Sequence, residues 1–189
     1  MAGQITVGSA ANCWASGNVS ASGNPGYFNA AGGFAGSIYE GSKAQDCFTV
    51  GSVTSSSGAA SAGGFVGRLA GTLTNCYATG TLQGNLDMYL NSEQGIVGTV
   101  RSYPSVLSCA DLMNTSRGFP MFVSAQDISK PKMDILTIQQ VVQEGTYTSR
   151  GWDFKDTWVL PSGGSYKLPI LRGVGEAAQA ALAMPTHLQ

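Results

Sequence analysis

A short glycine-bounded segment recurs at a fixed interval in the first part of the chain. The segment Gly-Phe-Ala-Gly-Ser-Ile at residues 33–38 returns as Gly-Phe-Val-Gly-Arg-Leu at residues 64–69, and more loosely as Gly-Ile-Val-Gly-Thr-Val at residues 95–100. The second residue of each copy lies 31 residues after its predecessor. A flexible linker has no reason to keep such an interval, so the pattern predicts stacked structural repeats.

A second segment alternates with the first and is centred on a cysteine. It reads Asn-Cys-Trp at residues 12–14, Asp-Cys-Phe at 46–48 and Asn-Cys-Tyr at 75–77, with a degraded copy, Ser-Cys-Ala, at 108–110. Apolar positions in both segments recur with a period of two, which is typical of strands with one buried face. A helix is disfavoured because each interior glycine costs about 1 kcal/mol relative to alanine.

Two short strands per repeat cannot bury a face alone, so we expect equivalent strands of successive repeats to lie in parallel, about 4.8 Å apart. The fold class predicted for residues 1–115 is therefore all-β, a parallel β-helix or β-solenoid of about four coils. It is expected to be right-handed, as parallel crossovers usually are. The predicted interior columns are Phe34/Phe65/Ile96, Ile38/Leu69/Val100, Val19/Val53/Leu82 and Cys13/Cys47/Cys76/Cys109.

The composition agrees with a glycine-rich repeat region and excludes some classes of partner. The chain has 26 glycines in 189 residues, and its ten basic and eleven acidic residues give a net charge of −1. Without a strong basic field we expect no nucleic-acid partner. No run of 18 apolar residues occurs and Met1 opens no signal peptide, so we expect no direct membrane insertion.

The closing part, residues 116–173, is predicted to be a small C-terminal α/β cap that covers the apolar end of the stack. A short helix is expected within residues 134–144, where Thr137 and Gln140 have capping-box spacing. The apolar residues expected in the cap are Trp152, Phe154, Trp158, Tyr166, Leu168, Ile170 and Leu171. Residues 174–189 form a tail with three open interpretations: a short helix ended by Pro185, a tether or a disordered end.

Three interpretations apply to the four cysteines. Zinc ligation is disfavoured because the chain has no Cys-x-x-Cys pair and a single histidine, His187, in the tail. Disulfides between neighbouring strands are feasible by distance, and an exported protein favours oxidation. In-register side chains that point the same way suit a reduced interior ladder better than the disulfide dihedral near 90°. We expect neither a metal nor a cofactor.

The aromatic residue after each of the first three cysteines is expected to point outward. Trp14, Phe48 and Tyr77 would then form one column. Stacking across strands is the structural interpretation of this column. A flat platform for sugar rings or for a partner protein is the functional interpretation, and it makes these three residues the candidate ligand-binding site.

Catalytic candidates are few. Asp153 and Asp156 flank the tryptophan cluster, and paired carboxylates can cleave glycosidic bonds. Nothing aligns a base, an acid and a basic residue around them, so capping or turn roles are preferred. His187 has no motif around it, and no His-Glu-x-x-His sequence occurs. We therefore expect a protein that is not an enzyme.

The pair Gly-Gly-Phe-Val-Gly-Arg and Asn-Cys-Tyr-Ala-Thr-Gly, within residues 63–80, resembles the GLUG repeat of bacterial surface proteins. That repeat is found in large adhesin-like chains and in some secreted immunoglobulin-cleaving metallopeptidases. The resemblance covers about residues 5–115, and the segment 137–171 is similar to the region that often closes such arrays. It implies an extracellular β-solenoid and names no ligand.

The leading hypothesis is a non-enzymatic structural or adhesive module of a bacterial surface protein, located outside the cell. Its expected partners are a host glycan, a host protein or neighbouring domains of a longer chain; the oligomeric state stays open. One alternative is a carbohydrate-active β-helix enzyme that uses Asp153, Asp156 or another acidic pair. The other is a subunit of a phage or another fibre.

Overall fold

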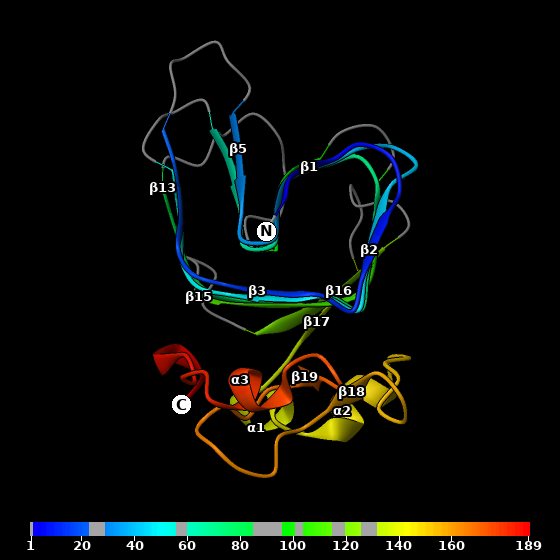
Figure 1. Ribbon diagram of the computed structural model, residues 1–189, viewed down its shortest axis with the longest axis vertical. Helices are drawn as coiled ribbons and strands as arrows, with labels where there is room; N and C mark the ends of the chain where they lie inside the picture. Colours follow the sequence, from blue (N-terminus) through cyan, green and yellow to red (C-terminus); the bar gives the residue numbers. More distant parts are fainter. Residues whose placement is uncertain are drawn as a thin grey trace.

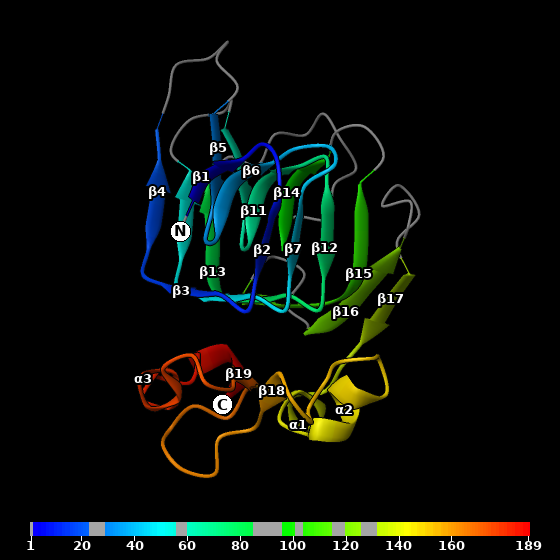
Figure 2. The ribbon, with the colours of Figure 1, turned by 45° about the vertical axis from the view of Figure 1, so that its right-hand side comes forward.

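The computed structural model describes residues 2–22, 29–55, 60–84, 96–100, 104–114, 120–125 and 132–189. In these residues the chain is mostly β, with parallel sheets and three short α-helices (Figures 1 and 2). The view in Figure 1 looks along the stack, so that equivalent strands of successive repeats lie over one another.

The phenylalanine-containing segments form one parallel sheet with the order β1-β6-β11-β14. Its strands are β1 (Ala2–Ile5), β6 (Ala35–Ile38), β11 (Val66–Leu69) and β14 (Val97–Val100). Ala35 pairs with Val66, and Val66 pairs with Val97. Residues that lie 31 positions apart in the sequence are therefore paired with one another in this sheet. Just before these strands, β5 (Asn29–Gly32) and β10 (Ala60–Gly63) form a second parallel pair.

The cysteine-containing segments form a larger sheet whose strands also pair with their counterparts in the next repeat. The strands on the N-terminal side of the cysteines are β2 (Ser9–Ala11), β7 (Lys43–Gln45), β12 (Thr72–Thr74) and the start of β15 (Ser105–Asn114). The strands after the cysteines are β3 (Trp14–Ser16), β8 (Phe48–Val50) and β13 (Tyr77–Gly84), and β4 (Val19–Ala21) pairs with β9 (Val53–Ser55) beyond them. Every one of these pairs is parallel.

The residue before each cysteine adopts the left-handed backbone conformation. These residues are Asn12, Asp46, Asn75 and Ser108, with φ between 49° and 52°. Asparagine and aspartate are enriched in this region because their short polar side chains tolerate it. The repeated Asn or Asp before Cys thus marks a bend between two strands, which repeats at the same place in each level of the stack.

The interior of the stack is a column-by-column apolar core. Phe34 and Phe65 stack with ring centroids 4.6 Å apart, and Ile38 and Leu69 are buried in register. Ile96, Val53 and Leu82 are buried too, whereas Val19 is half-buried. The side chain of Val100 lies outside the described residues. Equivalent positions of successive repeats therefore contribute to one common core, as the period of two predicts.

Cys13 departs from the predicted interior column. Cys47, Cys76 and Cys109 are buried, but Cys13 is exposed. It lies between β2 and β3, which are the two end strands of the sheet order, so each pairs with a described strand on one side only. The prediction of a buried Cys13 is wrong because the first repeat has a neighbour on one side only.

After β15 the strand pairing changes from parallel to antiparallel. Strand β16 (Met121–Ala125) pairs antiparallel with β15, and β17 (Lys132–Ile135) pairs antiparallel with β16. The chain continues into α1 (Ile138–Val141), which begins with the predicted capping box between Thr137 and Gln140. The helix predicted within residues 134–144 is thus shorter than expected, since its first residues belong to β17.

We call residues 136–189 the C-terminal segment. Its other elements are α2 (Glu144–Thr148), β18 (Trp158–Val159), β19 (Ile170–Leu171), α3 (Glu176–Ala180) and a 3₁₀-helix, η1 (Thr186–Leu188). Figures 1 and 2 both show it alongside the layer that contains β3 and β15. For residues 136–173 of the predicted cap, the position over the end of the stack is wrong: these residues pack on an outer face, where Phe48 and Tyr77 offer large apolar side chains.

Candidate functional site

The aromatic column forms, but it is covered. Trp14 and Phe48 stack with centroids 5.8 Å apart, and Phe48 and Tyr77 stack at 4.8 Å with nearly parallel planes. Phe48 and Tyr77 have no exposed surface, and Trp14 is half-buried. The column points away from the interior core, as predicted, yet the prediction of a solvent-facing ligand platform is wrong. The C-terminal segment already occupies that face.

Aromatic residues of the C-terminal segment cover the column. The Trp158 ring lies 6.3 Å from Phe48 and 6.0 Å from Tyr77, and it packs against Trp152 at 4.6 Å. The Tyr77 hydroxyl donates to the Pro169 carbonyl at 2.7 Å and lies 2.9 Å from the Tyr166 hydroxyl. Burial raises the pKa of Tyr77 well above its usual range. The predicted cap residues Phe154, Leu168, Ile170 and Leu171 are buried in the same cluster.

The left-handed bends anchor the C-terminal segment through hydrogen bonds. The Trp158 indole N–H donates to Asp46 Oδ1 at 3.1 Å, and the Trp152 indole N–H donates to the Ser108 carbonyl at 2.8 Å. Asn75 Nδ2 also donates to Asp46 Oδ1, at 3.2 Å. Buried indole N–H groups need such partners. The repeated bend therefore serves both as a turn and as a docking point.

The cysteines form a ladder of free thiols. Each sulfur lies within hydrogen-bond distance of the carbonyl two residues earlier, from 3.0 Å at Cys13 to 3.5 Å at Cys109. Burial raises the pKa of the Cys76 thiol well above its usual range. In the described ranges, no group of three or more His, Cys, Asp or Glu side chains could hold a metal ion.

The catalytic candidates have other partners. The Asp153 carboxylate accepts hydrogen bonds from the amides of Asp156 and Lys155 and from the Thr157 hydroxyl. Hydrogen bonds from these groups, that from the Asp156 amide foremost, lower the pKa of Asp153. This is the arrangement of a turn-forming aspartate. His187 Nε2 lies 2.8 Å from the Leu112 carbonyl, a contact between the tail and β15.

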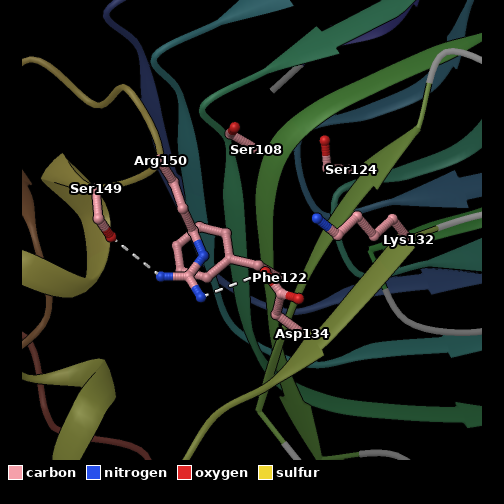
Figure 3. A pocket seen from close by; sticks show the side chains of 7 residues that line it. All are labelled: Ser108, Phe122, Ser124, Lys132, Asp134, Ser149 and Arg150. Atoms are coloured by element: carbon pink, nitrogen blue, oxygen red, sulfur yellow. Dashed lines mark hydrogen bonds and ion pairs between the residues drawn. The ribbon is translucent and has the colours of Figure 1, made fainter.

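A pocket of about 350 Å³ lies where β15, β16 and β17 meet the C-terminal segment (Figure 3). Two strand faces supply most of its lining. Ser124 pairs with Lys132 and Phe122 pairs with Asp134 across β16 and β17. Because side chains two residues apart share a face of a strand, all four lie on the same side of this hairpin.

The remaining lining comes from a bulge and from a helix end. The register between β15 and β16 shifts between Val106 and Cys109, and this interval contains Ser108 with its left-handed backbone. Bulges of this kind re-aim a side chain, here toward the pocket. Ser149 and Arg150 follow α2 and line the pocket from the C-terminal segment (Figure 3).

Arg150 is held from several sides. Its Nη1 donates to the Thr146 carbonyl at 2.6 Å and to Ser149 Oγ at 3.4 Å, while its Nη2 lies 3.4 Å from Asp134 Oδ2. The centre of the guanidinium lies 4.6 Å from the centroid of the Phe122 ring. Hydrogen bonds and a cation–π contact therefore fix the position of this cation.

No motif in the sequence predicts this pocket. Phe122 and Ser124, and likewise Lys132 and Asp134, alternate with a period of two, the only available signal. Arg150 and Ser108 are brought to them by tertiary packing, so no spacing rule could find them. The predicted site residues Trp14, Phe48 and Tyr77 lie outside the pocket lining.

Comparison with family models matches residues 58–83 to the GLUG motif. The chain carries a GLUG motif. The GLUG motif spans β10, β11, β12 and most of β13, which together make one repeat of the stack. Comparisons with curated proteins and with solved structures each found no match.

The GLUG motif contributes strands to the stack, and the pocket lies beyond it in the chain. Of the described helices, none has the length and apolar character that crossing a membrane requires.

Proposed function

We propose that this chain is a non-enzymatic module of a bacterial surface protein, a right-handed β-solenoid of about four coils that acts as a rigid spacer and presents a binding surface outside the cell. The observation that carries the proposal is the register of the repeats: equivalent segments pair in parallel at 31-residue intervals from β6 to β14. A stack of this kind extends by adding repeats, which is what a spacer requires.

Rigidity is supported by the way one face of the stack is fastened. The ring stack of Trp14, Phe48 and Tyr77 runs across three successive repeats. The C-terminal segment lies over the same rings and holds them through Trp158 and Tyr166. Bending the stack would separate these rings, and aromatic pairs contribute about 0.5–1.5 kcal/mol each beyond their burial.

The non-enzymatic part of the proposal is supported by the engagement of the candidate catalytic groups. The Asp153 carboxylate is occupied by its own turn, and His187 contacts a backbone carbonyl. The extracellular location is supported by the GLUG motif, which resembles repeats of surface proteins.

The direct test is a glycan and host-protein array, with each bound glycan analysed afterwards for cleavage. The proposal expects binding without product. Cleaved oligosaccharide that disappears in Asp153→Asn, but persists in Glu40→Gln, a change at an exposed carboxylate outside the pocket, would establish the carbohydrate-active enzyme instead. A stable trimer or filament in light scattering would favour the fibre subunit.

A further inference from the structure

We propose that the pocket between the β16–β17 hairpin and Arg150 binds a carboxylate-bearing sugar ring, a hexuronic acid unit of an acidic glycan. This inference rests on the proposed function, because it names the ligand class of the binding surface. The observations behind it are which side chains line the pocket and which of their polar groups already have partners.

The charge of the lining favours an anion. Three charged side chains line it: Lys132, Arg150 and Asp134. Arg150 and Asp134 pair with one another at 3.4 Å. The Lys132 ammonium has no hydrogen-bond or ion-pair partner within the part of the chain that the structure describes, and in Figure 3 it points from β17 toward the Arg150 side of the pocket. One unpaired positive charge is therefore available for a carboxylate.

The remaining polar groups favour a ligand that also carries hydroxyl groups. Ser108 and Ser124 bring two hydroxyls that can donate and accept. The Ser149 hydroxyl already donates to the Thr146 carbonyl, so it can only accept from a ligand. The Asp134 side chain is 49% exposed, so it still has acceptor capacity beside its contact with Arg150. A simple inorganic anion would meet the negative charge of Asp134, whereas a sugar hydroxyl can donate to it. A carboxylate together with several hydroxyls satisfies both kinds of group.

The pocket is small and its cationic side is preorganised. A volume of about 350 Å³ lies at the lower end of ligand pockets and suits a single sugar ring. The Arg150 guanidinium is fixed by Thr146, Ser149 and the Phe122 ring before any ligand arrives. Binding then costs little ordering of that side chain, which favours affinity.

The test is an NMR titration of the isotope-labelled full chain with sodium glucuronate, using glucose and inorganic phosphate as comparison probes. We expect saturable shifts at the amides of the pocket residues with glucuronate, and at least tenfold weaker binding of glucose and phosphate. Lys132→Ala should weaken glucuronate binding roughly tenfold, as expected for one charge-assisted hydrogen bond. Lys43→Ala, an exposed lysine on β7 outside the pocket, should leave it unchanged.

Each contrary result overturns the inference. Absence of shifts, equal shifts with glucose, tighter binding of phosphate, or glucuronate binding that survives Lys132→Ala would each remove the proposed ligand from the pocket. In the spectrum of each variant, the amide signals of residues outside the pocket report whether the fold is intact. Array binding that persists in Lys132→Ala would leave the proposed binding function standing while the pocket assignment fails.

Discussion

Asp46 has two roles in the stack: it forms a bend between two strands, and its side chain binds the C-terminal segment. Its backbone makes the bend before Cys47, and its carboxylate accepts hydrogen bonds from Trp158, Asn75 and Gln45. It is almost completely buried. A single side chain thus links two repeats to the C-terminal segment, so its replacement tests whether that link stabilises the fold.

Asp46→Ala should lower the free energy of unfolding by about 1–3 kcal/mol, because it leaves the buried indole N–H of Trp158 without its acceptor. Asp46→Asn keeps an acceptor oxygen and tolerance of the left-handed backbone, so its loss should be smaller. Urea unfolding followed by tryptophan fluorescence measures both. Equal losses in the two variants would mean that neither the acceptor nor the bend matters.

The thiol ladder makes a second prediction at this scale. One thiol, that of Cys13, should react quickly with a thiol reagent in the native protein, since the other three cysteines are buried. All four should react in denaturant. Four fast-reacting thiols in the native protein would show that Cys47, Cys76 and Cys109 are not buried. Fewer than four reactive thiols in denaturant would show that disulfides are present.

Burial of single residues was predictable where a neighbour lies one repeat away. Cys47 and Cys76 have such neighbours on both sides in register, and their burial follows from the spacing. Phe48 and Tyr77 were misjudged because the residue that covers both of them, Trp158, lies in a different part of the chain, far from either in sequence. No local pattern carries that information.

Close approach of the backbone between neighbouring repeats limits what each strand tolerates. Gly80 on β13 has φ of +118°, and a Cβ at this position would lie 2.1 Å from the Gly51 carbonyl oxygen of the neighbouring repeat. Gly51 has the same conformation, with φ of +125°. Both features restrict these positions to glycine.

Gly80→Ala should therefore destabilise the protein by more than about 1 kcal/mol, through the left-handed backbone and the clash together. Gly3→Ala on β1 is the matched control, since its Cβ would meet nothing within 4 Å. Thermal unfolding of both variants measures the difference. If Gly80→Ala proved as stable as Gly3→Ala, the neighbouring repeats would not approach as closely as the register requires.

The packing of the C-terminal segment predicts how stability depends on pH. Burial raises the pKa of Tyr77, Tyr147 and Tyr166 above the usual value of about 10. The unfolded chain therefore loses these protons at a lower pH than the folded chain. Stability should be unaffected by these groups below about pH 10 and should fall above it, by up to about 1.4 kcal/mol per pH unit for each tyrosine.

Urea unfolding at a series of alkaline pH values checks this slope, and Tyr166→Phe should make it shallower by one tyrosine. The ultraviolet absorbance of tyrosinate gives an independent readout. Titration of all seven tyrosines near pH 10 in a chain that stays folded would contradict the buried placement of these three.

Elements with a repeated partner were predictable, and those without one were not. The strands of the first three repeats follow from period and spacing, and α1 follows from its capping box. The β16–β17 hairpin was missed because its strands pair antiparallel with the last repeat and have no copy elsewhere. The pocket was missed with it, since both of these strands line it.

At the scale of the whole molecule, two apolar clusters define the fold. One lies inside the stack, and the other lies between its outer face and the C-terminal segment. The prediction of a cap over the stack's end had the right residues, Trp152, Phe154, Trp158, Tyr166 and Ile170, but the wrong place. The sequence shows that these large apolar side chains must be buried. Only the tertiary structure shows that they are buried against Phe48 and Tyr77 on the outer face of the stack.

The parallel stacking of successive repeats in register supports every other conclusion, and interproton contacts measured by NMR test it most directly. The rings of Phe34 and Phe65 should show strong mutual contacts, since their centroids lie 4.6 Å apart, and the methyl groups of Ile38 and Leu69 should do the same. Absence of both contacts, in spectra that show the expected contacts within each repeat, would contradict the stacked architecture.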